Sequence, residues 1–542
     1  MSQTRRQFLA GAAPLAAAAV LTPQALAAGL TSARKAPAFR GGRFASGLMS
    51  GDPTPRGITL WTTLDGVGGS GSVELEVAKD NAFKHLVTRK AIRTSAALDH
   101  SVKARVSGLD PYEQYYYRFA TKTKDSPVGR FRTALPADSK QPVKFAFFSC
   151  QDYTHGYYNA LEAMAAGDYD FVVCLGDYIY DETYHSIAGG TGVRDDKIGK
   201  AEPGYTSAIL AGQTLDDYRS KYALYRSDAS LRKVHAKFPV VMLWDDHEVQ
   251  DNYAGGAGPT GGLPAVQQYS AKRRAAGYKA FFENMPYYPV AKNRIYRSLQ
   301  FGRTVELLVM DQRQYRADQP CDDAVAPACA DWDQPRPFLG QTQMNWVKGR
   351  LEASTAAWKV MANEVMAMPA KVLGDAYFGF DSWQGYPRER EELLTHITSK
   401  GIKDVVFVTG DIHTFIAGDV KTAMGAGAPA GIEFVGGSIT SQGLGETDLD
   451  AGGGAVIKGN DANPNTPAAL INTLRAINPW VDVADFDHHG YGSVTATQQG
   501  FECELVRCQT IKQKTTALLP SAGFKYAVKR GQTSIKGVNG PA

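Results

Sequence analysis

Two patterns of apolar and polar residues divide the chain. Between residues 37 and 137, short runs of β-type residues are separated by glycine and proline, as in ITLWTTL, SVELEVAK, SVKARVSGL and QYYYRFATK. Regularly spaced short strands of this kind predict a β-sandwich. From residue 142 to residue 542 the runs become almost continuously apolar and alternate with helix-type stretches. This second pattern predicts buried strands with interposed helices, which is an α/β domain.

Within the first region, Leu109-Asp110-Pro111 followed by Tyr115 resembles the corner of fibronectin type III-like sandwiches. In that corner the tyrosine hydroxyl binds the backbone a few residues upstream. In the second region, helix-type periodicity covers residues 215–227, 338–354 and 388–400. The chain ends in a predicted helix over residues 465–480 and a β-hairpin over 490–506, which we expect to pack on the core.

The first 28 residues form a separate segment. Arg5 and Arg6 precede a weakly apolar, alanine-rich stretch that ends in Ala25-Leu26-Ala27. That order predicts a cleaved twin-arginine export signal, with an exposed arginine pair before an alanine-rich helix as the simpler alternative. No other apolar run is long enough to cross a bilayer. We therefore expect a protein that the twin-arginine machinery exports to the periplasm or the medium, and not an integral membrane protein.

Composition adds little about partners. A formal net charge of +4 over 542 residues gives no indication of a nucleic-acid-binding patch or an anionic membrane surface. Of the six cysteines, Cys321 and Cys329 flank a short loop and are expected to pair outside the cytoplasm, and Cys174 is expected to be a buried thiol. Cys503 and Cys508 would lie about 16 Å apart on one extended strand, too far for a disulfide, and their state stays open.

Polar side chains follow apolar run after apolar run. In an open α/β sheet, ligands bind beyond the carboxyl ends of the strands. One acidic residue after a strand is usually a helix cap, but capping does not account for five or six such ends. If these side chains converge, their mutual repulsion requires one or more multivalent cations. The residues are Cys150, Asp177 with Tyr180, Asp245-Asp246-His247-Glu248, Asp311 with Arg313, Asn363-Glu364, and Asp411 with His413.

These segments also carry a family resemblance. In order, CQDY, LGDYIYDE, WDDHEVQDN, MDQRQYR, ANEVMAMP and TGDIHT resemble the PhoD-type alkaline phosphatases, a branch of the calcineurin-like metallophosphoesterase superfamily. GDPTPRGITLWTTL resembles the start of that family's N-terminal sandwich. The resemblance spans nearly the whole mature chain. It implies a two-sheet α/β/β/α core behind a fibronectin type III-like β-sandwich, with a site that holds Fe³⁺ and one or more Ca²⁺.

Tyr180, Cys150 and Asp177 are among the residues that the resemblance implies as ligands of the iron. Tyr180 can bind a metal only as phenolate, and its ordinary pKa of about 10 calls for a strong Lewis acid such as Fe³⁺. The alternative is a tyrosine packed at the start of a helix. Cys150 stands where the superfamily usually has an aspartate, so a thiolate ligand fits. The alternative, a small buried apolar side chain, is weakened by the polar neighbours Ser149 and Gln151. Asp177 occupies the position of the carboxylate that bridges two metals.

Other positions favour oxygen ligands for a second ion. Asp246 matches the asparagine of the superfamily's Asn-His-Asp/Glu turn, and the amide of Asn252 follows in the family pattern; both suit Ca²⁺. Asp411 and His413 match a Gly-His-x-His turn in which aspartate replaces the first histidine, which argues against two zinc ions. His413 keeps an imidazole for the iron. Asn363 stands where the wider superfamily has another histidine.

The resemblance implies hydrolysis of small phosphate monoesters at alkaline pH. Metals would polarise a phosphoryl oxygen and generate a hydroxide or oxide nucleophile. His247 is the candidate catalytic acid for the leaving group, or else a histidine that Asp245 or Glu248 orients. Arg313 is the candidate catalytic clamp on phosphate, or else a partner of Asp311.

Two alternatives stay open. The same site in this family can act as a phosphodiesterase with phospholipase D-like activity, and the sequence does not decide between monoesters and diesters. A metal-stabilised surface or adhesion protein without catalysis is the alternative from another class. It predicts degraded ligand positions, whereas every strand end here keeps a ligand atom.

Overall fold

The computed structural model describes residues 37–183, 192–201, 210–255, 270–446 and 468–535. The expected twin-arginine signal, residues 1–28, lies outside the described residues. Among the helices that are described, none is long and apolar enough to cross a membrane.

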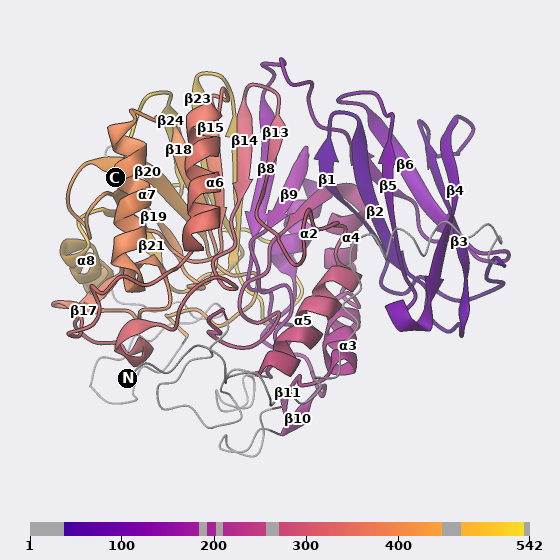
Figure 1. Cartoon of the computed structure of the whole chain (residues 1–542), viewed down its shortest axis with the longest axis horizontal. Helices are drawn as coiled ribbons and strands as arrows, with labels where there is room; N and C mark the ends of the chain where they lie inside the picture. The colour runs from indigo at the N-terminus through magenta and orange to yellow at the C-terminus, as the bar shows by residue number, and fades with distance from the viewer. Residues whose placement is uncertain (1–36, 184–191, 202–209, 256–269, 447–467, 536–542) are drawn as a thin grey trace, which may run out of the picture.

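The N-terminal region is a β-sandwich, as predicted, and lies at the right of Figure 1. One of its sheets has the strand order β4-β3-β6-β7, with bounds Leu86–Ser95, Ser70–Ala78, Gln114–Ala120 and Gly129–Arg132. The tyrosine corner is confirmed, because the Tyr115 hydroxyl accepts a hydrogen bond of 2.8 Å from the backbone N–H of Asp110. The periodicity did not predict β4, of whose ten residues only one is buried.

The other sheet of the sandwich continues into the α/β region. Its strands β1 (Leu48–Thr54), β2 (Gly57–Thr63) and β5 (Ser101–Ser107) form one edge of a nine-stranded sheet of order β24-β23-β22-β8-β9-β12-β1-β2-β5. The connection is the parallel pairing of β1 with β12 (Pro239–Met242), in which Gly51 lies opposite Val240. A Cβ atom at Gly51 would lie 2.8 Å from the carbonyl oxygen of Val240. The pattern change near residue 140 therefore does not separate the sheets.

The remaining strands of this sheet come from both ends of the α/β region. They are β8 (Val143–Phe148), β9 (Phe171–Cys174), β22 (Gly490–Ala496), β23 (Gly500–Arg507) and β24 (Lys525–Lys529). Strands β22 and β23 are the predicted hairpin, which pairs with β8 and so completes the core. The predicted helix before it is α8 (Ala468–Ile477).

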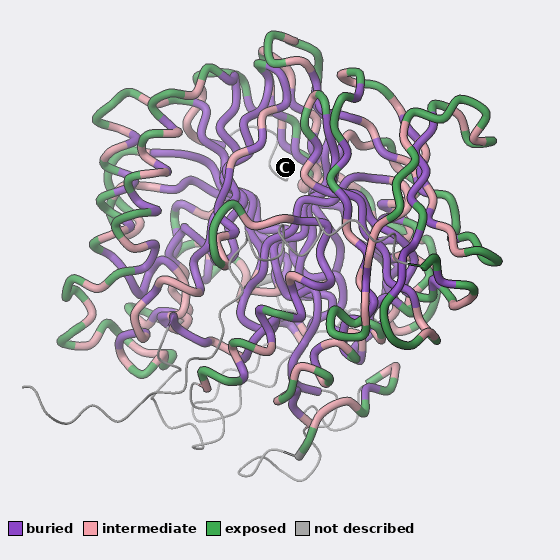
Figure 2. Tube along the Cα trace, turned by 45° about the vertical axis from the view of Figure 1, so that its right-hand side comes forward, coloured by how far each residue is buried: buried purple, intermediate pink, exposed green. Residues whose placement is uncertain are grey.

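A second sheet faces the first. It has seven strands in the order β13-β14-β15-β18-β20-β19-β21, with bounds Arg297–Phe301, Val305–Val309, Trp358–Asn363, Val405–Thr409, Pro429–Gly436, Phe415–Lys421 and Val481–Asp485. Apolar side chains of both sheets form one buried cluster between them. Figure 2 shows that buried residues lie at the centre of the molecule and that exposed residues lie mainly in its outer loops.

Helices cover the outer faces of the two sheets. Helices α6 (Gly340–Ala353) and α7 (Pro387–Ser399) lie against the seven-stranded sheet, in front of it in Figure 1. Helices α2 (Asn159–Ala166) and α4 (Ala229–Lys237) lie against the nine-stranded sheet. This α/β/β/α arrangement confirms the predicted fold class. Other elements are α3 (Leu215–Tyr225), α5 (Ala271–Asn284) and the short strands β10 (Lys200–Ala201), β11 (Leu210–Ala211), β16 (Lys371–Leu373) and β17 (Ala376–Tyr377).

The cysteines fall into two groups. Cys321 and Cys329 form a disulfide with a Cα–Cα distance of 5.5 Å, as predicted. Cys174 is a buried free thiol, which was also predicted, and Cys150 is buried as well. Cys503 and Cys508, which the sequence left open, are buried and not paired with each other.

Candidate metal centre

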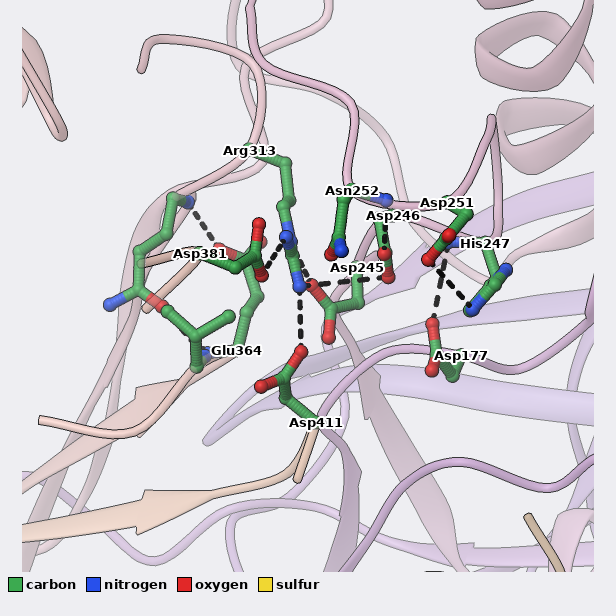
Figure 3. Close-up of polar contacts among 12 residues, drawn as sticks. Asp177, Asp245, Asp246, His247, Asp251, Asn252, Arg313, Glu364, Asp381 and Asp411 are labelled. Atoms are coloured by element: carbon green, nitrogen blue, oxygen red, sulfur yellow. Dashed lines mark hydrogen bonds and ion pairs between the residues drawn. The ribbon is translucent and has the colours of Figure 1, made fainter. Parts of the chain in front are cut away.

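The carboxyl ends of six strands meet at one edge of the two facing sheets. In the first sheet β8, β9 and β12 are parallel, and in the second β14, β15 and β18 are parallel. Because parallel strands end at the same edge, the polar residues that follow them converge there, as Figure 3 shows for several of them. The six polar strand ends that the sequence singled out therefore surround one site.

Cys150, Asp177, Tyr180 and His413 lie together. The Cys150 sulfur, a carboxylate oxygen of Asp177 and a ring nitrogen of His413 are all within 4.8 Å of one another. The Tyr180 hydroxyl lies 2.8 Å from Asp177 Oδ2 and 3.0 Å from His413 Nε2. Sulfur, phenol, carboxylate and imidazole thus face one point, which is the donor set that the family resemblance implies for iron.

Asp177 also belongs to a second group. One of its oxygens, an oxygen of Asp246 and a ring nitrogen of His247 lie within 4.8 Å of one another. The backbone N–H of Asn252 donates to Asp246 Oδ2 at 2.7 Å, and its side-chain amide donates to Asp323 Oδ2 at 3.2 Å. Asp177 therefore contributes an oxygen atom to both groups of potential ligands.

The electrostatics of these groups fit bound cations. Burial and the charge of Asp177 raise the pKa values of Cys150 and Tyr180 well above their ordinary values. Burial, with repulsion from Asp245 and other carboxylates, also raises the pKa of Asp411 well above its ordinary value. A cation among these donors would offset both the desolvation and the repulsion.

The backbone at the site adopts an uncommon conformation. Five of the predicted ligands have left-handed φ angles, namely 56° at Cys150, 52° at Asp177, 51° at Asn252, 70° at Asp411 and 55° at His413. Such conformations cost residues other than glycine about 1–3 kcal/mol each and cluster at functional sites. Gly176 lets the turn after strand β9 approach the turn after strand β12, since a Cβ atom at Gly176 would lie 2.7 Å from the backbone nitrogen of Asp245.

His247 is held by a residue that the sequence did not single out. Its Nδ1 lies 2.7 Å from Asp181 Oδ1, and Asp181 Oδ2 accepts a bond of 2.5 Å from Arg273. The expectation that Asp245 or Glu248 orients the ring was wrong. Glu248 instead accepts hydrogen bonds from the backbone N–H groups of Asp177, Tyr178 and Asp245, and so joins the two turns.

Arg313 is completely buried among carboxylates (Figure 3). Its Nε contacts Asp245, its Nη1 lies 2.6 Å from Asp381 Oδ2, and its Nη2 lies 2.8 Å from Asp411 Oδ1. The alternative pairing with Asp311 was wrong, because that carboxylate accepts from Trp244 Nε1 at 3.2 Å. Asn363 turns its amide oxygen toward Gln312 Nε2 at 2.5 Å, outside the two groups above.

Two family models match the chain. The model described as PhoD-like phosphatase matches residues 145–505, and the model of the PhoD-like phosphatase N-terminal domain matches residues 29–135. The chain belongs to the PhoD-like phosphatase family. Alkaline phosphatase D of Bacillus subtilis (strain 168) is 34% identical, over 99% of this chain and 89% of that relative. This PhoD-like phosphatase is therefore a hydrolase and a phosphatase.

Solved structures agree with this assignment. A structure of PhoD is 32% identical, covers 93% of this chain and 95% of its own, and superposes with a TM-score of 0.78. Purple acid phosphatase PPD1 from yellow lupin (Lupinus luteus) seeds is 11% identical over 89% of this chain and 74% of its own, with a TM-score of 0.53. The second likeness concerns the fold alone.

Sequence reasoning missed two carboxylates of this PhoD-like phosphatase. Asp181 directly follows Tyr180 in LGDYIYDE, so its place in the motif was a usable signal. Asp381 accepts hydrogen bonds from Arg313 and, at 2.5 Å, from Arg316. It lies in a loop whose sequence shows neither a strand-end pattern nor a recognisable motif. Only the fold brings that loop to the site.

Proposed function

We propose that this PhoD-like phosphatase is an exported, metal-dependent enzyme that hydrolyses small phosphate monoesters at alkaline pH. The observation that carries the proposal is the convergence of Cys150, Asp177, Tyr180 and His413 on one point, with Asp177 shared by the neighbouring group of Asp246 and His247. A phenolate ligand needs a strong Lewis acid, which favours trivalent iron over Ca²⁺ or Mg²⁺, and a thiolate fits the same site.

In this proposal, Asp177 lies between two groups of ligands, one for iron and one for calcium. Cys150, Asp177, Tyr180 and His413 would hold Fe³⁺, while Asp246, Asn252 and Asp411 would offer oxygen atoms to Ca²⁺. The chemistry that such ions supply is Lewis acidity, which polarises a phosphoryl oxygen and activates water.

The chain's own residues would handle the leaving group and the phosphate. Although burial lowers it, the carboxylates of Asp246, Asp177 and Asp181 raise the pKa of His247 well above its ordinary value. A charged His247, oriented by Asp181, suits donation of a proton to the leaving oxygen. Arg313 would reach phosphate through Nη2, the donor that now lies 2.8 Å from Asp411 Oδ1. If Asp411 served as a calcium ligand instead, that donor of Arg313 would be free to bind a phosphate oxygen.

Export is supported by two features of the chain. Arg5 and Arg6 begin a segment with the order of a twin-arginine signal. The disulfide between Cys321 and Cys329 is of a kind that persists in oxidising compartments.

Metal content and colour test the centre. We expect the purified protein to contain iron and calcium and to show a visible phenolate-to-iron charge-transfer band. Tyr180→Phe should abolish the band, since the phenol oxygen is the donor. Tyr178→Phe is the matched control, because its buried hydroxyl contacts Arg226 Nε at 3.1 Å and not the ligand cluster. A colourless wild-type protein rich in zinc would overturn the assignment.

The ester class is tested separately. We expect faster turnover of p-nitrophenyl phosphate than of bis-p-nitrophenyl phosphate at pH values above neutrality, measured as kcat/KM on the same preparation. A monoesterase site needs no room for a second ester substituent. Faster diester turnover would instead favour the phosphodiesterase or phospholipase D-like alternative and would leave the metal assignment intact.

A further inference from the structure

We propose that Ser441 is a positioning residue that donates a hydrogen bond to the phenolate oxygen of Tyr180 and fixes it for iron binding. The inference rests on the proposed function, in which Tyr180 is an iron ligand. Ser441 lies in the loop of residues 438–446, which follows strand β20 at the same edge as the metal centre. Its Oγ is 2.6 Å from the Tyr180 hydroxyl, and the residue is only 1% exposed.

The surroundings of Ser441 decide where its single proton goes. Its Oγ accepts a hydrogen bond of 3.1 Å from the backbone N–H of Asp152, and it has two acceptors within reach, Tyr180 Oη and the carbonyl oxygen of Cys150 at 2.8 Å. The Cys150 carbonyl already accepts from the backbone N–H groups of Thr440 and Ser441, at 3.3 and 3.2 Å. The hydroxyl proton is therefore available to Tyr180, and a charged acceptor forms the stronger bond.

Two other groups near the phenol oxygen, Asp177 and His413, do not compete with Ser441 as donors. Asp177 Oδ2 lies 2.8 Å away, and an ionised carboxylate has no proton, so it is an acceptor and not a donor. His413 Nδ1 lies 2.9 Å from the carbonyl oxygen of Gln442, so its proton points there and its Nε2 presents a lone pair. Of these three neighbours, only Ser441 has a proton available to donate to the Tyr180 oxygen when that oxygen is a phenolate.

The loop that carries Ser441 is itself anchored. Glu446 accepts a hydrogen bond of 3.0 Å from the backbone N–H of Gly443 and lies 3.2 Å from His489 Nε2. Ser438 Oγ donates to the carbonyl oxygen of Ser441 at 2.6 Å and lies 2.8 Å from His489 Nδ1. A single braced segment thus supplies both the hydroxyl that meets Tyr180 and, through Gln442, the carbonyl that sets the tautomer of His413.

The test is the absorption spectrum of the iron-loaded protein. Ser441→Ala should move the phenolate charge-transfer band to longer wavelength, because a phenolate without this hydrogen bond gives up charge more easily. Iron affinity should fall about 10- to 100-fold, as for other residues that orient metal ligands. Ser441→Thr keeps a hydroxyl and should restore the wild-type band.

Thr62→Val is the matched control, since it removes a buried hydroxyl of strand β2 that donates to the carbonyl oxygen of Gly47 at 2.7 Å and takes no part in bracing Ser441. A band that stays in place in Ser441→Ala, or moves equally in Thr62→Val, would overturn the inference while leaving iron and Tyr180 in place. A colourless wild-type protein would overturn the proposed function and this inference together.

A second measurement needs no variant. If the exchangeable hydroxyl proton of Ser441 is hydrogen-bonded to the phenolate oxygen, the resonance Raman bands of the tyrosinate should differ between wild-type protein in H₂O and in D₂O. Identical bands in the two solvents would contradict the inference, even if Ser441→Ala failed to fold.

Discussion

Replacing Asp177 with asparagine should lower phosphatase activity by at least about 1,000-fold. Asp177 belongs to both groups of potential ligands and is 2% exposed, so its loss affects both proposed ions. Metal ions contribute several kcal/mol of transition-state stabilisation, and about 4 kcal/mol corresponds to roughly 1,000-fold in rate. The measurement is kcat/KM for p-nitrophenyl phosphate, with the metal content of each preparation.

Asp333→Asn provides the comparison, because Asp333 is an exposed partner of Arg388 at 2.6 Å on the surface. It should keep wild-type activity and metal content. If Asp177→Asn retained both ions and more than about a tenth of the activity, Asp177 would not be a shared ligand.

Arg313→Met should destabilise the metal-free protein by about 3–5 kcal/mol, since it leaves buried carboxylates without their counter-charge. Arg313 is 0% exposed and contacts Asp245, Asp381 and Asp411. Added Ca²⁺ should recover part of the loss, because a cation that binds the folded state replaces some of the missing charge. Denaturant unfolding with chelator and with Ca²⁺ measures both effects.

Arg388→Met is the matched control. The Arg388–Asp333 pair is about half exposed on both sides, at 53% and 53%, and an exposed pair contributes about 0–1 kcal/mol. An Arg313→Met protein as stable as the Arg388→Met protein under chelation would show that the buried carboxylates do not depend on Arg313.

The amino-acid sequence by itself predicted most of the elements and the group of polar strand ends. Apolar periodicity is local, so it predicted the α/β region, the helices near 215–227, 338–354 and 388–400, and the final hairpin. The disulfide was predictable because its two cysteines are separated by only 8 positions. The polar strand ends were predictable as a group, because parallel strands present their carboxyl ends at one edge.

Only the tertiary structure decided which side chains hold that group in place. Tyr180 and Ser441 are 261 positions apart, and Arg313 and Asp381 are 68 apart, so no local pattern links them. Strand β1 contains Gly-Asp-Pro and has no strand-like alternation, yet it pairs with β12 and joins the sandwich to the core. Sequence patterns specify which residues are apolar or can ligate, whereas hydrogen bonds between distant turns depend on how the two sheets pack.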